Sequence, residues 1–251
     1  MAHKHFSRLL LWLLVVIIGL MGFNVQMALA LDTVTVSVLV NIQGFKGISA
    51  DEKKILEDTI KQNIADANRI LERECTDCKL VLKVAKIKWN PDGATTVHQG
   101  VSETSKLTDE GKKELDSELG KGKGQKIYIV DQVLKDDGEE ASGLGADGEP
   151  VAYIPFGTLA VQPIRDKETG NIIGYQGIHG HYIVHELLHN AGLTNREHTS
   201  KGSLFDETLD SGTREKKRTM MDDQCKKLKA YFKSRGTTTR EAASGEKTSL
   251  R

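Results

Sequence analysis

The sequence predicts a mixed α/β fold in which helices pack against a β-sheet. Residues 34–42 are rich in β-branched side chains, as buried strands are. Apolar residues recur at intervals of three and four over residues 56–71, and residues 179–191 form a second helical pattern. Strand and helix patterns therefore alternate along the chain, which is the order expected when helices cover a sheet.

The first of these helices has a clear start and one apolar face. Ser49 and Glu52 have the spacing of a capping box, in which each side chain accepts the other residue's backbone N–H. The apolar stripe that follows lies on one side of the helix and is directed at the sheet. Its members are Leu56, Ile60, Ile64, Ala67 and Leu71.

Shorter elements follow in order. Apolar runs predict further strands at residues 80–89, 126–130 and 151–154, with a short extended piece at 172–175. Less regular patterns predict a helix around residues 110–119 and a final helix at 223–234. Turn residues occupy positions 166–171. Residues 136–149 are acidic and rich in glycine; we expect a mobile surface loop, with a calcium site as the alternative.

The first thirty residues have the order of a secretory signal peptide. Lys4 and Arg8 form a positive start, residues 9–23 are an apolar run broken only by glycine, and residues 28–30 are Ala-Leu-Ala. Such a run of about 15 residues is short for a membrane span, which needs about 20. We expect cleavage after Ala30, and an uncleaved membrane anchor is the alternative.

The chain that remains after cleavage is nearly neutral. The whole sequence has 35 basic and 35 acidic residues, and removing Lys4 and Arg8 leaves 33 basic residues against 35 acidic ones. This balance gives no electrostatic reason to expect a nucleic-acid partner. Residues 31–235 are enough for one domain with a core, and residues 236–251 are too polar to pack, so we expect them to form a disordered tail.

Three cysteines are expected to be structural. They are Cys75, Cys78 and Cys225. Disulfides persist in exported proteins, so Cys225 is expected to pair with either Cys75 or Cys78, which leaves one thiol over. Cys75 and Cys78 have no histidine nearby, so they do not make a convincing zinc site.

His185, Glu186 and His189 carry the strongest chemical signal in the chain. The two histidines are four residues apart on a helix, so their imidazoles project from one face and can share a zinc ion. Glu186 lies about 100° around the helix, where it can act as general base on a water at the metal. The apolar residues around them predict that this helix is buried, and Gly192 is placed to end it.

This segment resembles the signature of the metzincin clan of zinc peptidases, which is His-Glu-x-x-His-x-x-Gly followed by a third ligand. His185, Glu186, His189 and Gly192 match that signature in place. Zinc peptidases of this clan also have a methionine turn beneath the metal. Here, residues 218–222 (Arg-Thr-Met-Met-Asp) resemble that turn, with Met221 as the methionine.

The resemblance extends over roughly residues 34–234 and implies a zincin-like fold. That fold has a mixed, mostly parallel, twisted sheet with an antiparallel edge strand, a long helix on the sheet, an active-site helix and a small C-terminal helical subdomain. Residues 151–154 resemble the edge strand, which holds an extended substrate by main-chain pairing.

The third zinc ligand departs from the family spacing. That spacing leads to Asn195, which is a poor zinc ligand, whereas His198 follows three residues later. Because longer loops before the third histidine are known in the clan, we predict His198 as the third ligand. Asp206 and Asp210 are the carboxylate alternatives.

Other histidines are weaker candidates. His181 lies one turn before His185, but three histidines in line along one helix point divergently and do not converge on a tetrahedral ion. His179 and His98 have no spacing that favours metal binding.

The resemblance implies a secreted or periplasmic zinc endopeptidase acting on protein or peptide substrates. Zn²⁺ is expected on His185, His189 and His198, with Glu186 assisting the attack of zinc-bound water on the peptide bond. We expect a monomer with no nucleic-acid partner and no membrane span after signal cleavage. The destination can be the periplasm, the cell surface or the medium, and substrate specificity depends on the unpatterned residues 199–218.

Two other functions are compatible with the same helix. One is a zinc peptidase whose third ligand is a distant glutamate, for example Glu207. The other is an exported metzincin-like binding protein without catalytic activity, which the asparagine at position 195 favours.

Overall fold

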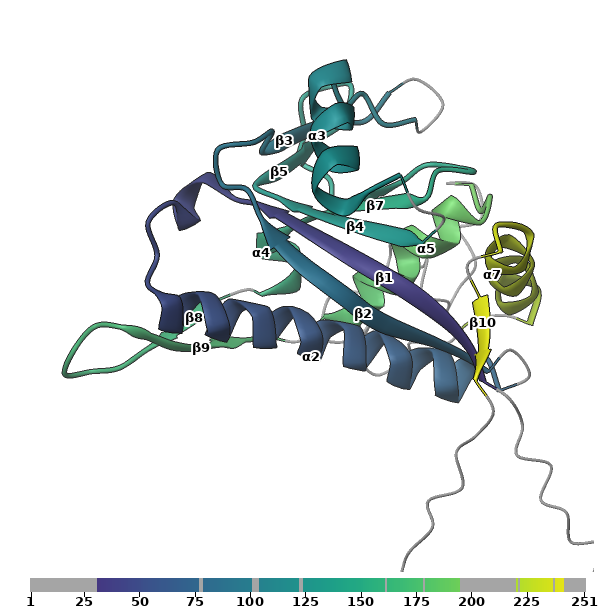
Figure 1. Ribbon diagram of the computed structural model, residues 1–251, viewed down its shortest axis with the longest axis horizontal. Helices are drawn as coiled ribbons and strands as arrows, with labels where there is room; N and C mark the ends of the chain where they lie inside the picture. Colours follow the sequence, from purple (N-terminus) through teal and green to yellow (C-terminus); the bar gives the residue numbers. More distant parts are fainter. Residues whose placement is uncertain are drawn as a thin grey trace, which may run out of the picture. The chain divides into compact units, whose positions relative to one another are not determined.

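A mixed β-sheet with helices on both of its faces organises the computed structural model (Figure 1). The structure describes residues 31–76, 79–100, 104–121, 124–160, 162–177, 179–194, 220, 222–236 and 238–241. Residues 31–241 belong to one compact unit. Within the described residues, no helix is both long and apolar enough to cross a membrane.

Six strands of the described residues form the main sheet. In order across the sheet they are β2 (Leu80–Trp89), β1 (Leu31–Asn41), β4 (Gln125–Val130), β7 (Val151–Pro155) and β6 (Leu144–Gly145), while β10 (Thr238–Glu241) pairs with the first residues of β1 on the side that β4 occupies further along. The strands β2, β1, β4 and β7 are parallel to one another. Strand β6 is antiparallel to β7 and lies at the edge. The predicted mixed, mostly parallel sheet with an antiparallel edge strand is therefore confirmed.

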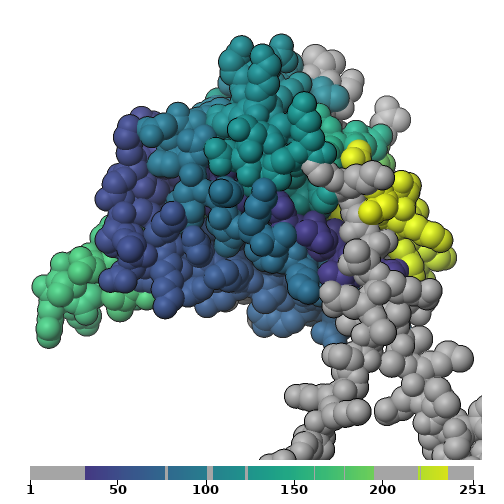
Figure 2. Space-filling view, in the orientation of Figure 1, coloured from purple at the N-terminus to yellow at the C-terminus, as the bar shows by residue number. Residues whose placement is uncertain are grey.

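Two small sheets accompany the main one. Strands β3 (Thr96–His98) and β5 (Gln132–Leu134) form a parallel pair. Strands β8 (Gln162–Arg165) and β9 (Ile172–Gln176) form an antiparallel hairpin. The predicted turn joins β8 to β9, and this hairpin projects past α2 (Figures 1 and 2).

The described residues contain five α-helices and one short 3-10 helix. These are η1 (Gln43–Phe45), α2 (Ala50–Glu74), α3 (Asp109–Leu119), α4 (Phe156–Leu159), α5 (Gly180–Asn190) and α7 (Asp222–Ser234). The predicted capping box is present at the start of α2, where Ser49 and Glu52 bond reciprocally. All five residues of its predicted apolar stripe are buried.

Alternation along the central strands divides the core between the two faces of the sheet. Ile127 and Ile129 pack with α2, α5 and α7 on one face, whereas Tyr128 and Val130 pack with α3 on the other. Successive side chains of a strand point to opposite faces, so an interior strand needs apolar residues at every position. This explains why β4 is buried throughout.

The assignment of residues 151–154 as the antiparallel edge strand is wrong. Strand β7 is parallel to β4, buried at all five positions, and lies between β4 and β6. The edge strand is β6, inside the segment that we expected to be a mobile surface loop, and Leu144, Gly145 and Ala146 are buried there. A two-residue strand in a glycine-rich segment has no periodic pattern, so no local signal marked it.

Part of the expected C-terminal tail is also ordered into the sheet. Thr238–Glu241 pair as β10 with the first residues of β1, so the expectation of disorder is wrong for these four residues. Strand β4 pairs with β1 only from Val36 onward. The first residues of β1 therefore have an edge available, and β10 occupies it. Residues 242–251 lie outside the described residues.

A disulfide joins the end of α2 to α7. Cys75, which follows the last turn of α2, is bonded to Cys225 in the first turn of α7 across 150 residues of sequence. Of the two pairings that the sequence allowed, the structure contains the one with Cys75. Cys78 lies outside the described residues.

Candidate metal centre

The helix α5, which carries His185, Glu186 and His189, is fixed against α2 at its first turn. A side chain at Gly180 would collide with the backbone of Asn63 and Ala67, so only glycine lets the two helices cross this closely. The Asn63 side chain accepts the N–H of His179 (2.8 Å), and the Asp66 carboxylate accepts the N–H of Gly180 (3.0 Å). These acceptors satisfy N–H groups that a helix start leaves without partners in the helix.

Apolar side chains of α5 hold the rest of the helix in the core. Ile183, Val184, Leu187 and Leu188 are all at most 1% exposed and pack with the strands and with α2. The predicted burial of this helix is therefore confirmed. His185, on another side of the helix, is only half-buried.

His185 and His189 lie one turn apart with their ring nitrogens together. Their Nε2 atoms are 3.1 Å apart, and their ring centroids are 4.9 Å apart. Two nitrogen ligands of one tetrahedral zinc ion, each about 2.0–2.1 Å from the metal, are about 3.3 Å apart. The two imidazoles therefore already have almost the separation that a shared zinc ion requires.

The end of α5 orients the ring of His189. Gly192 has a φ of 84°, which reverses the chain so that Leu193 returns its N–H to the carbonyl of Leu188 (3.1 Å). The carbonyl of Leu193 then lies 2.8 Å from Nδ1 of His189. A carbonyl accepts and cannot donate, so Nδ1 carries the proton and Nε2 keeps the lone pair that a metal needs. The predicted helix end at Gly192 is confirmed.

Glu186 is buried beside a glycine-rich segment. Its residue is 2% exposed, and a Cβ atom added at Gly143 would be 2.5 Å from its Oε1 atom. A Cβ atom at Gly145 would collide with the carbonyl oxygen of Glu186 and lie 2.9 Å from Cβ of His189. Strand β6 therefore runs directly against the part of α5 that carries the predicted base and one predicted ligand.

The structure does not describe the other predicted ligands. Residues 195–219 lie outside the described residues, and they include His198, Asn195, Asp206, Glu207 and Asp210. Met221 also lies outside them. Among the residues that are described, no three His, Cys, Asp or Glu side chains lie close enough to share a metal. His181 therefore does not complete a site with His185 and His189; its ring packs against Tyr182 (4.1 Å between centroids) in the first turn of α5.

Two residues of the predicted methionine turn, Met220 and Asp222, are described, and Met220 is anchored to the end of α2. Met220 is 7% exposed, and its sulfur lies 4.0 Å from the sulfur of Cys75. Its N–H donates to the carboxylate of Glu74 (3.3 Å). The disulfide between α2 and α7 therefore lies beside the segment in which the methionine turn is predicted.

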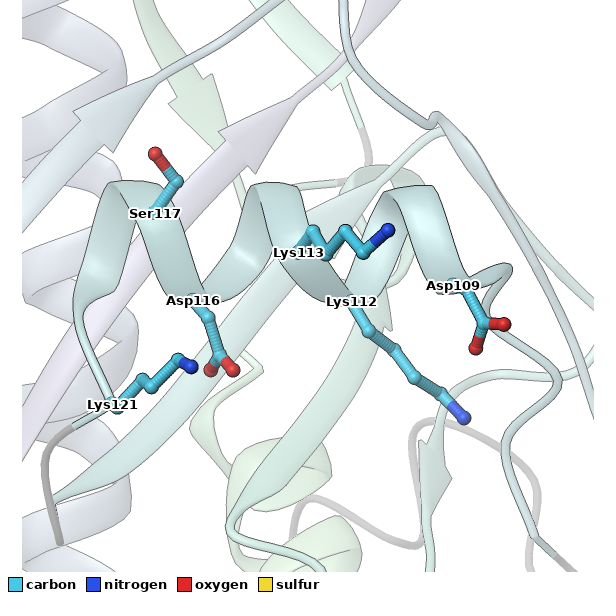
Figure 3. A pocket seen from close by; sticks show the side chains of 6 residues that line it. All are labelled: Asp109, Lys112, Lys113, Asp116, Ser117 and Lys121. Carbon is cyan, nitrogen blue, oxygen red and sulfur yellow. The ribbon is translucent and has the colours of Figure 1, made fainter.

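A separate surface pocket lies along α3 (Figure 3), on the opposite face of the sheet from α5. It is lined by Asp109, Lys112, Lys113, Asp116, Ser117 and Lys121. Asp116 also accepts a 2.7 Å hydrogen bond from the buried Lys126 of β4. None of the residues predicted for catalysis or metal binding lines this pocket.

No protein-family model matches this sequence, and no curated protein matches it. The residues of α5 and their surroundings therefore carry the assignment of function.

Proposed function

We propose that this protein is a metzincin-like zinc endopeptidase that acts outside the cytoplasm. The observation that carries the proposal is the pair of Nε2 atoms of His185 and His189, 3.1 Å apart, on the same helix as the buried carboxylate of Glu186. The donor set suits zinc, because neutral imidazole nitrogens are common zinc ligands. His198 is the proposed third ligand.

A zincin-like fold for this chain is part of the proposal. Its support is the chain order of the main-sheet strands and of the two helices α2 and α5: strand β1, long helix α2, strands β2 and β4, antiparallel edge strand β6, strand β7 and then α5. The edge strand is next to the predicted metal helix, which is the arrangement that a peptidase of this kind needs to hold an extended substrate. Strand β6 takes the role that the sequence resemblance gave to residues 151–154.

In the proposed reaction a peptide bond is hydrolysed. When bound, zinc supplies Lewis acidity toward the attacking water and the scissile carbonyl. Glu186 takes a proton from the water as it attacks and passes that proton to the leaving amine. His189, whose ring is oriented by the carbonyl of Leu193, and the half-buried His185 would hold the metal.

Substrate binding is assigned to the free edge of the main sheet. Within the described part of the chain, β6 pairs only with β7, so we assign its other side to an extended peptide. Because β6 lies against Glu186, a peptide bound along this edge passes close to the proposed base.

Metal analysis tests the proposal. Purified wild type should contain one zinc ion per chain; His198→Ala should lose it, and Asn195→Ala should keep it. Wild type without zinc would refute the enzyme function and favour an exported binding protein. Zinc retained by His198→Ala would move the third ligand to Asp206, Asp210 or Glu207.

Replacement of the base separates metal binding from catalysis. Glu186→Gln should keep stoichiometric zinc and lose peptide hydrolysis by at least a hundredfold, since general-base catalysis contributes about 10²–10⁴ in rate. The assay is cleavage of a denatured protein substrate. Hydrolysis at the wild-type rate would refute the role of Glu186.

A further inference from the structure

Asn190, the last residue of α5, binds both ends of the loop between β6 and β7. Its side chain is fully buried, and its Nδ2 atom donates to the carbonyls of Ala146 (2.9 Å) and Val151 (3.0 Å). Its own carbonyl accepts the N–H of Gly148 (3.1 Å). A single residue next to His189 therefore makes three hydrogen bonds to the backbone of this loop.

The amide of Asn190 is itself held in one orientation. Its Oδ1 atom accepts a hydrogen bond from Nε2 of Gln125 (3.2 Å) in β4. The hydroxyl of Tyr231 in α7 donates to the carbonyl of Glu149 (2.6 Å) in the same loop. Buried carbonyls are costly to leave without a donor, so this network fixes the path of the loop.

Apart from the buried side chain of Leu144, strand β6 has only a short backbone pairing to keep it in place. Its pairing with β7 consists of two residue pairs, Leu144 with Tyr153 and Gly145 with Ala152. Gly145 contributes no side chain, because it lies directly against the backbone of α5 at Glu186. The position of this strand relative to α5 therefore depends strongly on the loop that Asn190 binds.

We infer that Asn190 is a positioning residue that keeps β6 against α5, so that a peptide paired along β6 lies in register with Glu186. This role rests on the proposed peptidase function. Asn190 touches neither the metal nor the substrate; it acts through the carbonyls of Ala146 and Val151. Two donors on one nitrogen are required, which selects an amide at this position.

Asn190→Asp tests whether Asn190 keeps β6 in position. Aspartate has the shape of asparagine and still offers an acceptor to Gln125, but it lacks the two N–H donors to Ala146 and Val151. Hydrogen exchange measured on the metal-free full chain should be at least tenfold faster over residues 142–149 and unchanged in β1. The matched control is Asn68→Asp, whose amide binds Leu82 in β2 at the opposite edge of the sheet; its effect should stay near β2. Unchanged exchange over residues 142–149 in the Asn190 variant would overturn the inference.

Inhibitor binding tests the link to substrate. Asn190→Asp should bind a peptide hydroxamate at least tenfold more weakly than wild type, while acetohydroxamate, which needs only the metal, should bind equally well. Equal weakening of both inhibitors would show a merely structural role and overturn the inference. If the aspartate variant does not fold, Asn190→Ser, which keeps one donor, replaces it in both experiments. Wild type without zinc would refute the proposed function, and the exchange experiment would still decide whether Asn190 holds β6.

Discussion

At the scale of single residues, contacts within the chain orient the side chains of the proposed metal centre. The ring of His189 is oriented by the carbonyl of Leu193, and this carbonyl is in place because Gly192 reverses the chain. A ligand oriented in this way loses little freedom on binding a metal. Removing the hydrogen-bond partner of a metal-binding histidine typically costs about 10–100-fold in metal affinity or activity. The helix places His185 one turn away, with its Nε2 atom 3.1 Å from that of His189.

His189→Ala should abolish stoichiometric zinc binding, because it removes one of the two ligands on α5. His98→Ala is the matched control, since His98 is an exposed residue of β3 outside the predicted site. Zinc content after dialysis, measured by atomic spectroscopy, checks both variants. Equal zinc in the two variants would contradict the assignment of His189.

At the scale of elements, α5 and β6 form one unit with the loop that connects β6 to β7. Close approach of β6 requires glycine at position 145, and the loop is held by Asn190 and Tyr231. Packing at this contact leaves no room for added atoms. A substitution there should therefore act on the candidate site without touching a predicted ligand.

Gly145→Ala should push β6 away from α5, because the added methyl group would collide with the carbonyl of Glu186. Overpacking of this kind costs about 1–3 kcal/mol, and we expect peptide hydrolysis to fall together with the free energy of unfolding. Gly44→Ala is the control, since nothing lies within 4 Å of the Cβ position there. Chemical denaturation and a hydrolysis assay measure the two effects; loss in both variants alike would contradict the prediction.

Tyr231→Phe should lower stability and change its dependence on pH. Burial raises the pKa of Tyr231 from 10.0 to about 12, so the folded state holds this proton more tightly than the unfolded state. The stabilisation is fully present below pH 10 and is lost as the pH rises toward 12. The variant should be about 1 kcal/mol less stable at pH 7, because it loses the hydrogen bond to Glu149. Denaturation from pH 8 to 12 should show the gap to wild type closing; parallel curves would contradict the prediction.

At the scale of the whole molecule, the Cys75–Cys225 disulfide joins parts of the chain that are far apart in sequence. It fastens α7 to the end of α2 beside Met220. Strand β10 then returns the chain to the start of β1. The two ends of the described chain are thus both tied to the same region of the sheet.

Cys225→Ser should destabilise the protein by about 2–5 kcal/mol, because the bridge restricts a long loop in the unfolded chain. Cys78→Ser is the control and should leave the bridge and the stability unchanged. Thermal denaturation with and without a reducing agent measures the effect: reduction should lower the melting temperature of wild type and of Cys78→Ser only. A large effect of reduction on Cys225→Ser would contradict the pairing.

The sequence by itself determined the elements and residues whose signals are local. The capping box of α2, its apolar stripe, the strands β1, β2 and β4 and the helix end at Gly192 depend on neighbours a few residues away, so their patterns are visible in the chain. The spacing of His185 and His189 belongs to the same class, because a helix converts four residues into one turn.

Only the tertiary structure decided which strand lies at the edge, which cysteine pairs with Cys225, and what surrounds Glu186. Strand β6 has two residues and no pattern, and its place is set by glycines that admit it against α5. Asn190 is one polar residue at the end of an apolar helix, and its partners lie about 40 residues away or more. Such contacts exist only after distant segments have packed together, so no local pattern in the chain predicts them.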